Sequence, residues 1–419
     1  MLTGAEATKA ATFAAKGGGW LWRRWRPDTS HRALAGQADD LADRVHRVEG
    51  PNLEQLGVTR SRGADVVFEA SARVRAAGGQ DVGSLREVSG YYGELDSGRL
   101  VVLGEPGAGK TVLALHLLLD LLEHRADPAA APGPVPVRVN AAGWDVDNIH
   151  FGRWLVQGLT DLGLLAPIAR ALIDDGLVLP VVDGLDEMDP QGQPPTRTRK
   201  ALERLNEAPW RGRPVILTCR STTYEAVQAL RAGGGPDAGL YEATAVTVSP
   251  LTPEQVSANV QARRRGEGLR DEDVWAPIFD RLKAEPAGPL AGPLAGALST
   301  PWMLSLTVDR LRVATPHQAE ELAASVDLPT LRSHLFAALI PAAVQGRSTE
   351  DKTRYTDAQV HHWLAGLAQH LDTRRGQGHD GTNIALGDLW RMAGPRAPRV
   401  LHTLTVGLEF IAANFAVLY

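Results

Sequence analysis

Residues 100–111 read Leu-Val-Val-Leu-Gly-Glu-Pro-Gly-Ala-Gly-Lys-Thr, an apolar run followed directly by the pattern G-x-x-x-x-G-K-S/T. The eight residues of the pattern are Gly104, Glu105, Pro106, Gly107, Ala108, Gly109, Lys110 and Thr111. In such a loop, backbone N–H groups surround a β-phosphate, the lysine ammonium reaches the β- and γ-phosphates, and the threonine hydroxyl coordinates Mg²⁺. The stretch predicts that this chain binds a nucleotide with Mg²⁺, and that Lys110 and Thr111 are the principal side chains of that site.

Five short apolar runs alternate with helical segments between residues 98 and 250, at 100–103, 135–139, 177–182, 215–218 and 243–248. Runs of this length without polar alternation are typical of strands buried on both faces of a parallel sheet. The segment 111–125 is apolar nearly all round, as a helix packed against such a sheet should be. We therefore expect an α/β fold, a P-loop NTPase parallel sheet flanked by helices, with helical N-terminal and C-terminal regions.

The composition is that of an ordinary globular protein, with 419 residues, 44% apolar residues and a net charge of -5. This charge gives no overall indication of nucleic-acid binding. The single cysteine, Cys219, excludes an internal disulfide and is expected to be a small buried strand residue. Because the N-terminus lacks the apolar stretch of a secretory signal, we expect a cytoplasmic protein.

Helical spacing dominates on both sides of the predicted sheet. Apolar positions over residues 30–48 predict a helix that Gly50-Pro51 stops, so the first ninety residues are expected to be mostly helical. The tandem Ala-Gly-Pro-Leu at 287–294 predicts a loop, and Thr356 with Gln359 predicts a capping box for a helix with an apolar stripe. We expect four regions: 1–90 helical, 91–255 the NTPase domain, 256–345 a helical domain associated with it, and 346–419 helical with an apolar tail.

Two terminal segments leave alternatives open. Residues 16–27 interleave three tryptophans with three arginines, which indicates either a membrane-surface or nucleic-acid contact, or tryptophans that pack on the next helix. Residues 400–419 are apolar but contain His402 and Glu409, which favours a packed terminal helix over a membrane segment. Weak membrane association through either segment therefore stays an alternative.

Three acids follow the third apolar run, in Asp183-Gly184-Leu185-Asp186-Glu187. The position about seventy residues after the loop is where a P-loop fold places its Mg²⁺ carboxylate, so Asp183 is the expected Mg²⁺ aspartate. Glu187, or else Asp186, is expected to orient or deprotonate the attacking water.

Arg220 follows the fourth run and should reach the same edge of the sheet. A guanidinium there can bind the γ-phosphate and so distinguish ATP from ADP. The alternative is a salt bridge from Arg220 to a nearby acid such as Asp186.

With these motifs in place, residues 90 to 340 resemble the NACHT family of STAND-type NTPases. The resemblance depends on the small Gly184 directly after the aspartate, on the two further acids Asp186 and Glu187, and on residues 248–252 and 298–304, which are similar to the family's strand exit and its proline segment. It implies that Pro301 contacts the adenine.

The resemblance implies an ADP/ATP-gated switch with slow Mg²⁺-dependent hydrolysis, which self-oligomerises on ATP binding after a protein stimulus. Bacterial members act in signalling and in defence against phage. The alternative function is a membrane-tethered scaffold whose nucleotide pocket is structural.

Overall fold

The computed structural model describes residues 28–55, 67–70, 82–127, 129, 132–190, 192–229, 239–267, 272–285, 292–311, 314–324, 327–345, 355–376 and 405. Residues 16–27, with the interleaved tryptophans and arginines, lie outside these ranges. The apolar tail at 400–419 also lies outside them, except for Thr405.

A sheet of seven strands in the order β2-β1-β7-β3-β6-β5-β4 forms the centre of the molecule. The five predicted strands are confirmed as β3 (Arg99–Leu103), β4 (Val135–Asn140), β5 (Val178–Asp183), β6 (Val215–Cys219) and β7 (Thr244–Val248). They pair in parallel, and β3, β5 and β6 are buried along their whole length. The predicted α/β fold is therefore present.

Two further strands, which the sequence analysis did not predict, lie among the described residues of the first ninety. The strands β1 (Val67–Ala70) and β2 (Val82–Ser84) extend the sheet beyond β7 in antiparallel pairs. Phe68 is buried and lies edge to face with the ring of Tyr91. These strands are only four and three residues long, so no period in the sequence marks them.

The first described helix, α2 (His31–Gln55), also differs from the prediction, because it continues through Gly50-Pro51. Leu53 in its last turn is buried. The helix packs on β4 and α5, and this burial offsets the backbone hydrogen bond that proline cannot donate.

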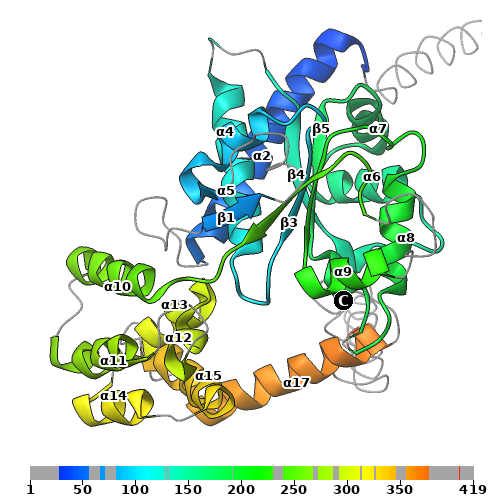
Figure 1. Cartoon of the computed structure of the whole chain (residues 1–419). Helices are drawn as coiled ribbons and strands as arrows, with labels where there is room; N and C mark the ends of the chain where they lie inside the picture. The colour runs from blue at the N-terminus through cyan, green and yellow to red at the C-terminus, as the bar shows by residue number, and fades with distance from the viewer. Residues whose placement is uncertain are drawn as a thin grey trace, which may run out of the picture.

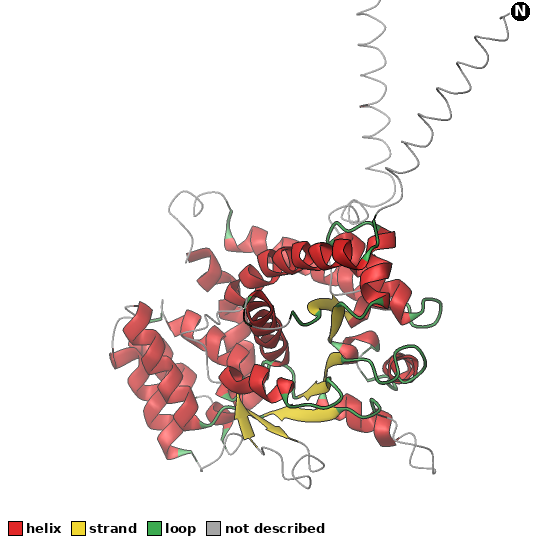
Figure 2. Cartoon of the chain, turned by 90° about the horizontal axis from the view of Figure 1, so that it is seen from above, coloured by secondary structure: helices red, strands yellow, loops and turns green. Residues whose placement is uncertain are grey.

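Helices cover both faces of the sheet (Figure 1). On one side lie α2, α4 (Val88–Gly93) and α5 (Lys110–Ala126), and on the other lie α6 (Phe151–Asp161), α7 (Ala166–Asp174), α8 (Thr196–Leu205) and α9 (Ser221–Ala229). Short 3-10 helices follow three strands: η1 (Leu85–Glu87), η2 (Ala141–Gly143) and η3 (Leu185–Met188). The view in Figure 2 shows the strands enclosed between helices. As predicted, α5 is buried nearly all round.

A second hydrophobic cluster begins at Leu251, just before α10, and is otherwise built by helices. Its helices are α10 (Pro253–Glu267), α11 (Glu272–Ala284), α12 (Pro293–Leu298), α13 (Pro301–Leu311), α14 (Pro316–Ala323) and α15 (Leu328–Gln345). The backbone N–H of Leu251 donates to the carbonyl of Ser299 at 2.6 Å, which fastens the exit of β7 to the start of α13. Only part of the predicted loop 287–294 can be compared, and there Pro293 and Leu294 already belong to α12.

The last described helix, α17 (Asp357–Gly376), begins with the predicted capping box. The Thr356 N–H donates to the Gln359 side chain at 2.9 Å, and the Gln359 N–H donates back to the Thr356 hydroxyl at 3.3 Å. Its apolar stripe is not buried, since Trp363 is 50% exposed. Among the described residues, no helix combines the length and the apolar character that crossing a membrane requires.

Candidate nucleotide site

The predicted phosphate loop lies between the central strand β3 and the helix α5, with α5 starting at Lys110. Gly109 caps this helix with φ 102° and ψ 17°, a left-handed conformation that glycine adopts without the steric cost of a Cβ. The loop therefore delivers the N-terminal N–H groups of α5 to one place, where the helix dipole favours an anion.

Lys110 is turned back into the loop. Its Nζ donates to the carbonyls of Gly104 at 2.9 Å and Glu105 at 3.0 Å. Burial lowers the pKa of the Lys110 ammonium, and the charge of Asp186 partly opposes this effect. The ammonium is thus bound here by neutral carbonyl groups, which a phosphate group can replace with a stronger charge-assisted contact.

Asp183 lies at the end of β5 and is bound by two hydroxyl groups. Its Oδ1 accepts from Thr218 Oγ1 at 2.6 Å and from Thr111 Oγ1 at 3.2 Å. Thr218, in β6, also accepts the N–H of Gly184 at 2.8 Å. The structure therefore brings together the hydroxyl and the carboxylate that the sequence assigns to Mg²⁺.

This pair of groups fits a magnesium ion. Hydroxyl and carboxylate oxygens are the hard donors that Mg²⁺ prefers, and Mg²⁺ is usually held by one or two such side chains together with nucleotide phosphates. Thr111 and Asp183 are the residues that would hold it beside the phosphate loop.

Arg220 and Asp186 form an ion pair at the same edge of the sheet. Arg220 Nε lies 2.7 Å from Asp186 Oδ2, and the Arg220 backbone N–H donates to Asp186 Oδ1 at 3.0 Å. The salt bridge that the sequence left open as an alternative is therefore formed in this structure. Cys219, which precedes Arg220, is fully buried in β6 as expected, and burial raises the pKa of its thiol.

Gly184 caps the start of the short helix η3, and Glu187 lies within it. Gly184 has φ 75°, and a Cβ at this position would lie 3.1 Å from the Glu187 Cδ. The Glu187 N–H donates to the Gly184 carbonyl at 2.9 Å. Both the backbone conformation and the position of the Glu187 side chain therefore favour glycine after Asp183.

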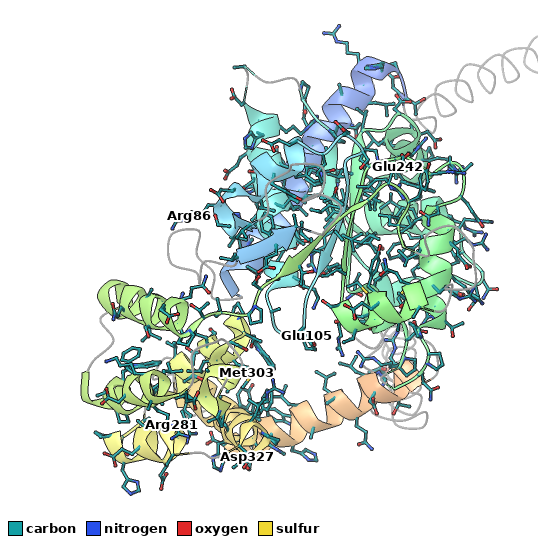
Figure 3. The ribbon with its side chains drawn as sticks, in the orientation of Figure 1. Arg86, Glu105, Glu242, Arg281, Met303 and Asp327 are labelled. Atoms are coloured by element: carbon teal, nitrogen blue, oxygen red, sulfur yellow. The ribbon has the colours of Figure 1, made fainter. Side chains whose placement is uncertain are left out.

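The segment around Pro301 lies against the phosphate loop from the second cluster. Pro301 is the first residue of α13, and a Cβ at Gly107 would lie 3.4 Å from Thr300 Oγ1 and 3.5 Å from Trp302 Cβ. Figure 3 labels Glu105 of the loop and Met303 of α13 on either side of this junction. The structure thus brings the neighbours of Pro301 to the phosphate loop from almost 200 residues away in the sequence.

Two charged residues at this site were not singled out from the sequence. Arg138 Nη1 lies 3.4 Å from Asp183 Oδ2, while Nε and Nη2 of the same guanidinium donate to the two carboxylate oxygens of Glu49, each at 3.1 Å. The available signal was an arginine inside the otherwise apolar run 135–139, because a charge on a buried strand needs a charged partner. Its partner Glu49 lies in α2, and nothing in the sequence around Glu49 indicated this pairing.

Comparison with known proteins agrees with this geometry. Residues 99–263 match the family model of the NACHT domain. No curated protein matches the sequence.

Two solved structures are similar in part. The Walker-type ATPase of Pyrococcus abyssi shares 13% sequence identity at a TM-score of 0.37, over 73% of this chain and 87% of that one. Domain III of the replication initiation protein DnaA from Thermotoga maritima shares 15% identity at a TM-score of 0.30, over 61% of this chain and 89% of that one.

Proposed function

Because this chain contains a NACHT domain, a nucleotide-binding P-loop NTPase domain, we propose that it is an ADP/ATP-gated signalling switch with slow Mg²⁺-dependent ATP hydrolysis. ATP binding would change the arrangement of the chain and promote its self-association in response to a protein stimulus. In a bacterial cell such a switch would suit defence signalling.

The observation that carries this proposal is the ion pair between Arg220 and Asp186. Arg220 is bound by a carboxylate of the site itself rather than by a distant structural acid. A γ-phosphate is a stronger competing anion than a single carboxylate, whereas ADP has no group at that position. We therefore propose that ATP draws Arg220 away from Asp186 and that ADP leaves the pair in place.

The close approach of the helical cluster to the phosphate loop would allow nucleotide binding to affect the position of α13. A Cβ at Gly107 would lie within 3.5 Å of Thr300 and Trp302, and Pro301 between them is the proposed adenine contact. A nucleotide at the loop would therefore meet α13 directly. The expected boundary near residue 255, between an NTPase domain and a helical domain, is supported by the change of hydrophobic cluster between Val248 and Leu251.

For hydrolysis we propose Glu187 as the residue that orients and deprotonates the attacking water. The Arg220 backbone N–H donates to Asp186 Oδ1, and this bond does not depend on the position of the Arg220 side chain. Glu187 follows Asp186 directly on η3, at the same end of β5 as Asp183. Bound Mg²⁺ would neutralise negative charge on the β- and γ-phosphate oxygens.

The test compares ATP and ADP affinity in the wild type and in Arg220→Met. We expect the ATP affinity to fall about tenfold and the ADP affinity to stay within about twofold, because only the triphosphate reaches the guanidinium. Equal losses for both nucleotides would contradict the sensor role.

Size distributions test the switch itself. We expect larger species with a non-hydrolysable ATP analogue than with ADP, and no difference in Arg220→Met. Steady hydrolysis without any change in size would instead indicate a turnover ATPase.

A further inference from the structure

A chain of three charged groups leads from the Mg²⁺ carboxylate out to the helix α2. Asp183 Oδ2 contacts Arg138 on the neighbouring strand β4, and Arg138 is bound by both oxygens of Glu49 in α2. Asn52 Nδ2, one turn further along α2, donates to Glu49 Oε2 at 2.7 Å. These residues come from three segments separated by at least 45 positions in the sequence.

All three groups are shielded from solvent, so their charges act on one another strongly. The side chains of Glu49 and Asp183 are 8% and 10% exposed, and that of Arg138 is 24% exposed. Burial alone would lower the pKa of the Arg138 guanidinium, but the two carboxylates outweigh burial and raise it. A guanidinium pairs with carboxylates most strongly when the contact is bidentate, as it is with Glu49.

Arg138 and Mg²⁺ would act on the same carboxylate. A positive charge 3.4 Å from Asp183 opposes a divalent cation there unless a negative charge compensates it. Glu49 supplies that compensation, and it also holds the guanidinium from the side away from Asp183.

We propose that Glu49 and Arg138 are positioning residues for the Mg²⁺ carboxylate, through which α2 is coupled to the binding of the Mg²⁺-nucleotide. The inference rests on the proposed nucleotide site at Thr111 and Asp183. With Mg²⁺ at that site, repulsion would move Arg138 toward Glu49 and would strengthen the anchoring of α2. By thermodynamic linkage, losing the Glu49 charge weakens the gain in nucleotide affinity that Mg²⁺ provides.

The test measures the affinity of a fluorescent ADP analogue with Mg²⁺ and with EDTA, in the wild type and in Glu49→Gln. In the variant the Arg138 charge is left uncompensated beside Asp183. We expect the affinity gained from Mg²⁺ to fall about tenfold. The affinity in EDTA should stay equal or rise, because a free guanidinium attracts the phosphates.

The double variant Glu49→Gln/Arg138→Gln provides the rescue. It removes both charges but keeps amide groups that can hydrogen-bond, so the Mg²⁺ gain should return to within about threefold of the wild type. Asp39→Asn is the matched control, because Asp39 lies on the same helix and pairs with Arg125 of α5 at 2.7 Å. It should leave the Mg²⁺ gain unchanged.

Several outcomes would overturn the coupling. They are an unchanged Mg²⁺ gain in Glu49→Gln, an equal loss of affinity with Mg²⁺ and with EDTA, and a double variant as weak as the single one. If the wild type binds no nucleotide at all, the proposed function fails instead, so the two failures are distinguishable.

Amide hydrogen exchange on the wild type gives a second measurement that needs no variant. With the ADP analogue present, adding Mg²⁺ should increase protection in residues 45–53 of α2. Protection that rises only in the phosphate loop and not in this segment would also overturn the proposal.

Discussion

At the amino end of β3, the guanidinium of Arg99 is fully buried, and its hydrogen-bond partners among the described residues are neutral groups. It donates to four backbone carbonyls at 2.7 to 3.2 Å, those of Tyr241, Trp210, Arg213 and Leu205. At the carboxyl ends of β5 and β6, and on β4 beside them, arginines are bound by carboxylates instead, Arg220 by Asp186 and Arg138 by Glu49 and Asp183. Figure 3 labels Glu242, near the amino end of β3, and Glu105, in the phosphate loop at its carboxyl end.

The difference separates stability from binding. No ligand can replace the carbonyls around Arg99 without breaking the backbone structure that supplies them, so this arginine fixes the loops at the amino edge. At the carboxyl ends of the strands, carboxylates and loop carbonyls bind the charged side chains of Lys110, Arg138 and Arg220. Phosphate groups would attract these side chains, and Mg²⁺ would repel them. Substitutions at the first edge should therefore change stability, and those at the second edge should change nucleotide binding and hydrolysis.

The largest effect is expected at the amino edge. Arg99→Met removes the side-chain donors to four carbonyls, so we expect the free energy of unfolding to fall by about 4 kcal/mol. Chemical denaturation of the nucleotide-free protein measures this. Arg213→Met is the control, because Arg213 donates a single hydrogen bond, to the Ile173 carbonyl at 3.0 Å, and should cost about 1 kcal/mol. Similar costs for the two variants would remove the special role of the buried arginine.

Lys110→Ala tests the opposite edge. We expect nucleotide affinity to fall at least about 100-fold, because the phosphates lose their principal charge-assisted contact. The free energy of unfolding should change by no more than about 1 kcal/mol, since only hydrogen bonds to two loop carbonyls are lost. Titration and denaturation measure the two quantities, and Lys200→Ala, at an exposed ion pair with Asp147, is the control. A large loss of stability in Lys110→Ala would contradict the distinction between stabilising residues at the amino ends of the strands and binding residues at their carboxyl ends.

Glu187→Gln should separate binding from chemistry within the carboxyl edge. The amide cannot accept the proton of water, so we expect single-turnover hydrolysis to slow about 100-fold while ATP affinity stays within about twofold. The variant should accumulate the ATP-bound form. Equal hydrolysis in the wild type and in Glu187→Gln would transfer the role to Asp186, which Asp186→Asn would then test.

The smallest effect is expected for Gly184→Ala. The backbone at Gly184 is left-handed, so alanine should cost about 1.5 kcal/mol of stability, or roughly 4 °C in melting temperature. Its Cβ also meets the Glu187 side chain, and hydrolysis should slow more than nucleotide binding weakens. Gly176→Ala is the control, because Gly176 has φ 71° but no atom within 4 Å of a Cβ. It should lower stability to a similar extent and leave hydrolysis unchanged.

The sequence predicted the parts of the fold whose signals are local. The five parallel strands were marked by runs of Val and Leu, and the phosphate loop by residue types that each have a defined chemical task. The strands β1 and β2 gave no such mark, since their stability comes from pairing with β7 across almost 180 residues. The continuation of α2 past Pro51 was missed for the same reason, because contacts with β4 and α5 outweigh local propensity.

In the candidate site, too, the residues with local sequence signals were predicted and those that depend on distant segments were not. Lys110, Thr111 and Asp183 could be proposed from spacing, and the structure places them together as expected. For Arg220 the sequence left two alternatives open, a contact with the γ-phosphate and a salt bridge with Asp186. The choice depends on the direction in which η3 places Asp186. The link from Asp183 through Arg138 to Glu49 was not predicted. An arginine in an apolar run indicates that an acidic partner lies nearby, but it does not indicate which segment of the chain provides that partner.

The hydrogen bond between Leu251 and Ser299 has a mechanical consequence. Ser299 directly precedes Thr300, whose Oγ1 would lie 3.4 Å from a Cβ at Gly107, while α14 lies at the far side of the helical cluster (Figure 1). A rotation of the cluster about this bond would move Thr300 by a short arc and α14 by a long one. If nucleotide binding rotates the cluster in this way, a small displacement at the phosphate loop would produce a larger displacement at α14.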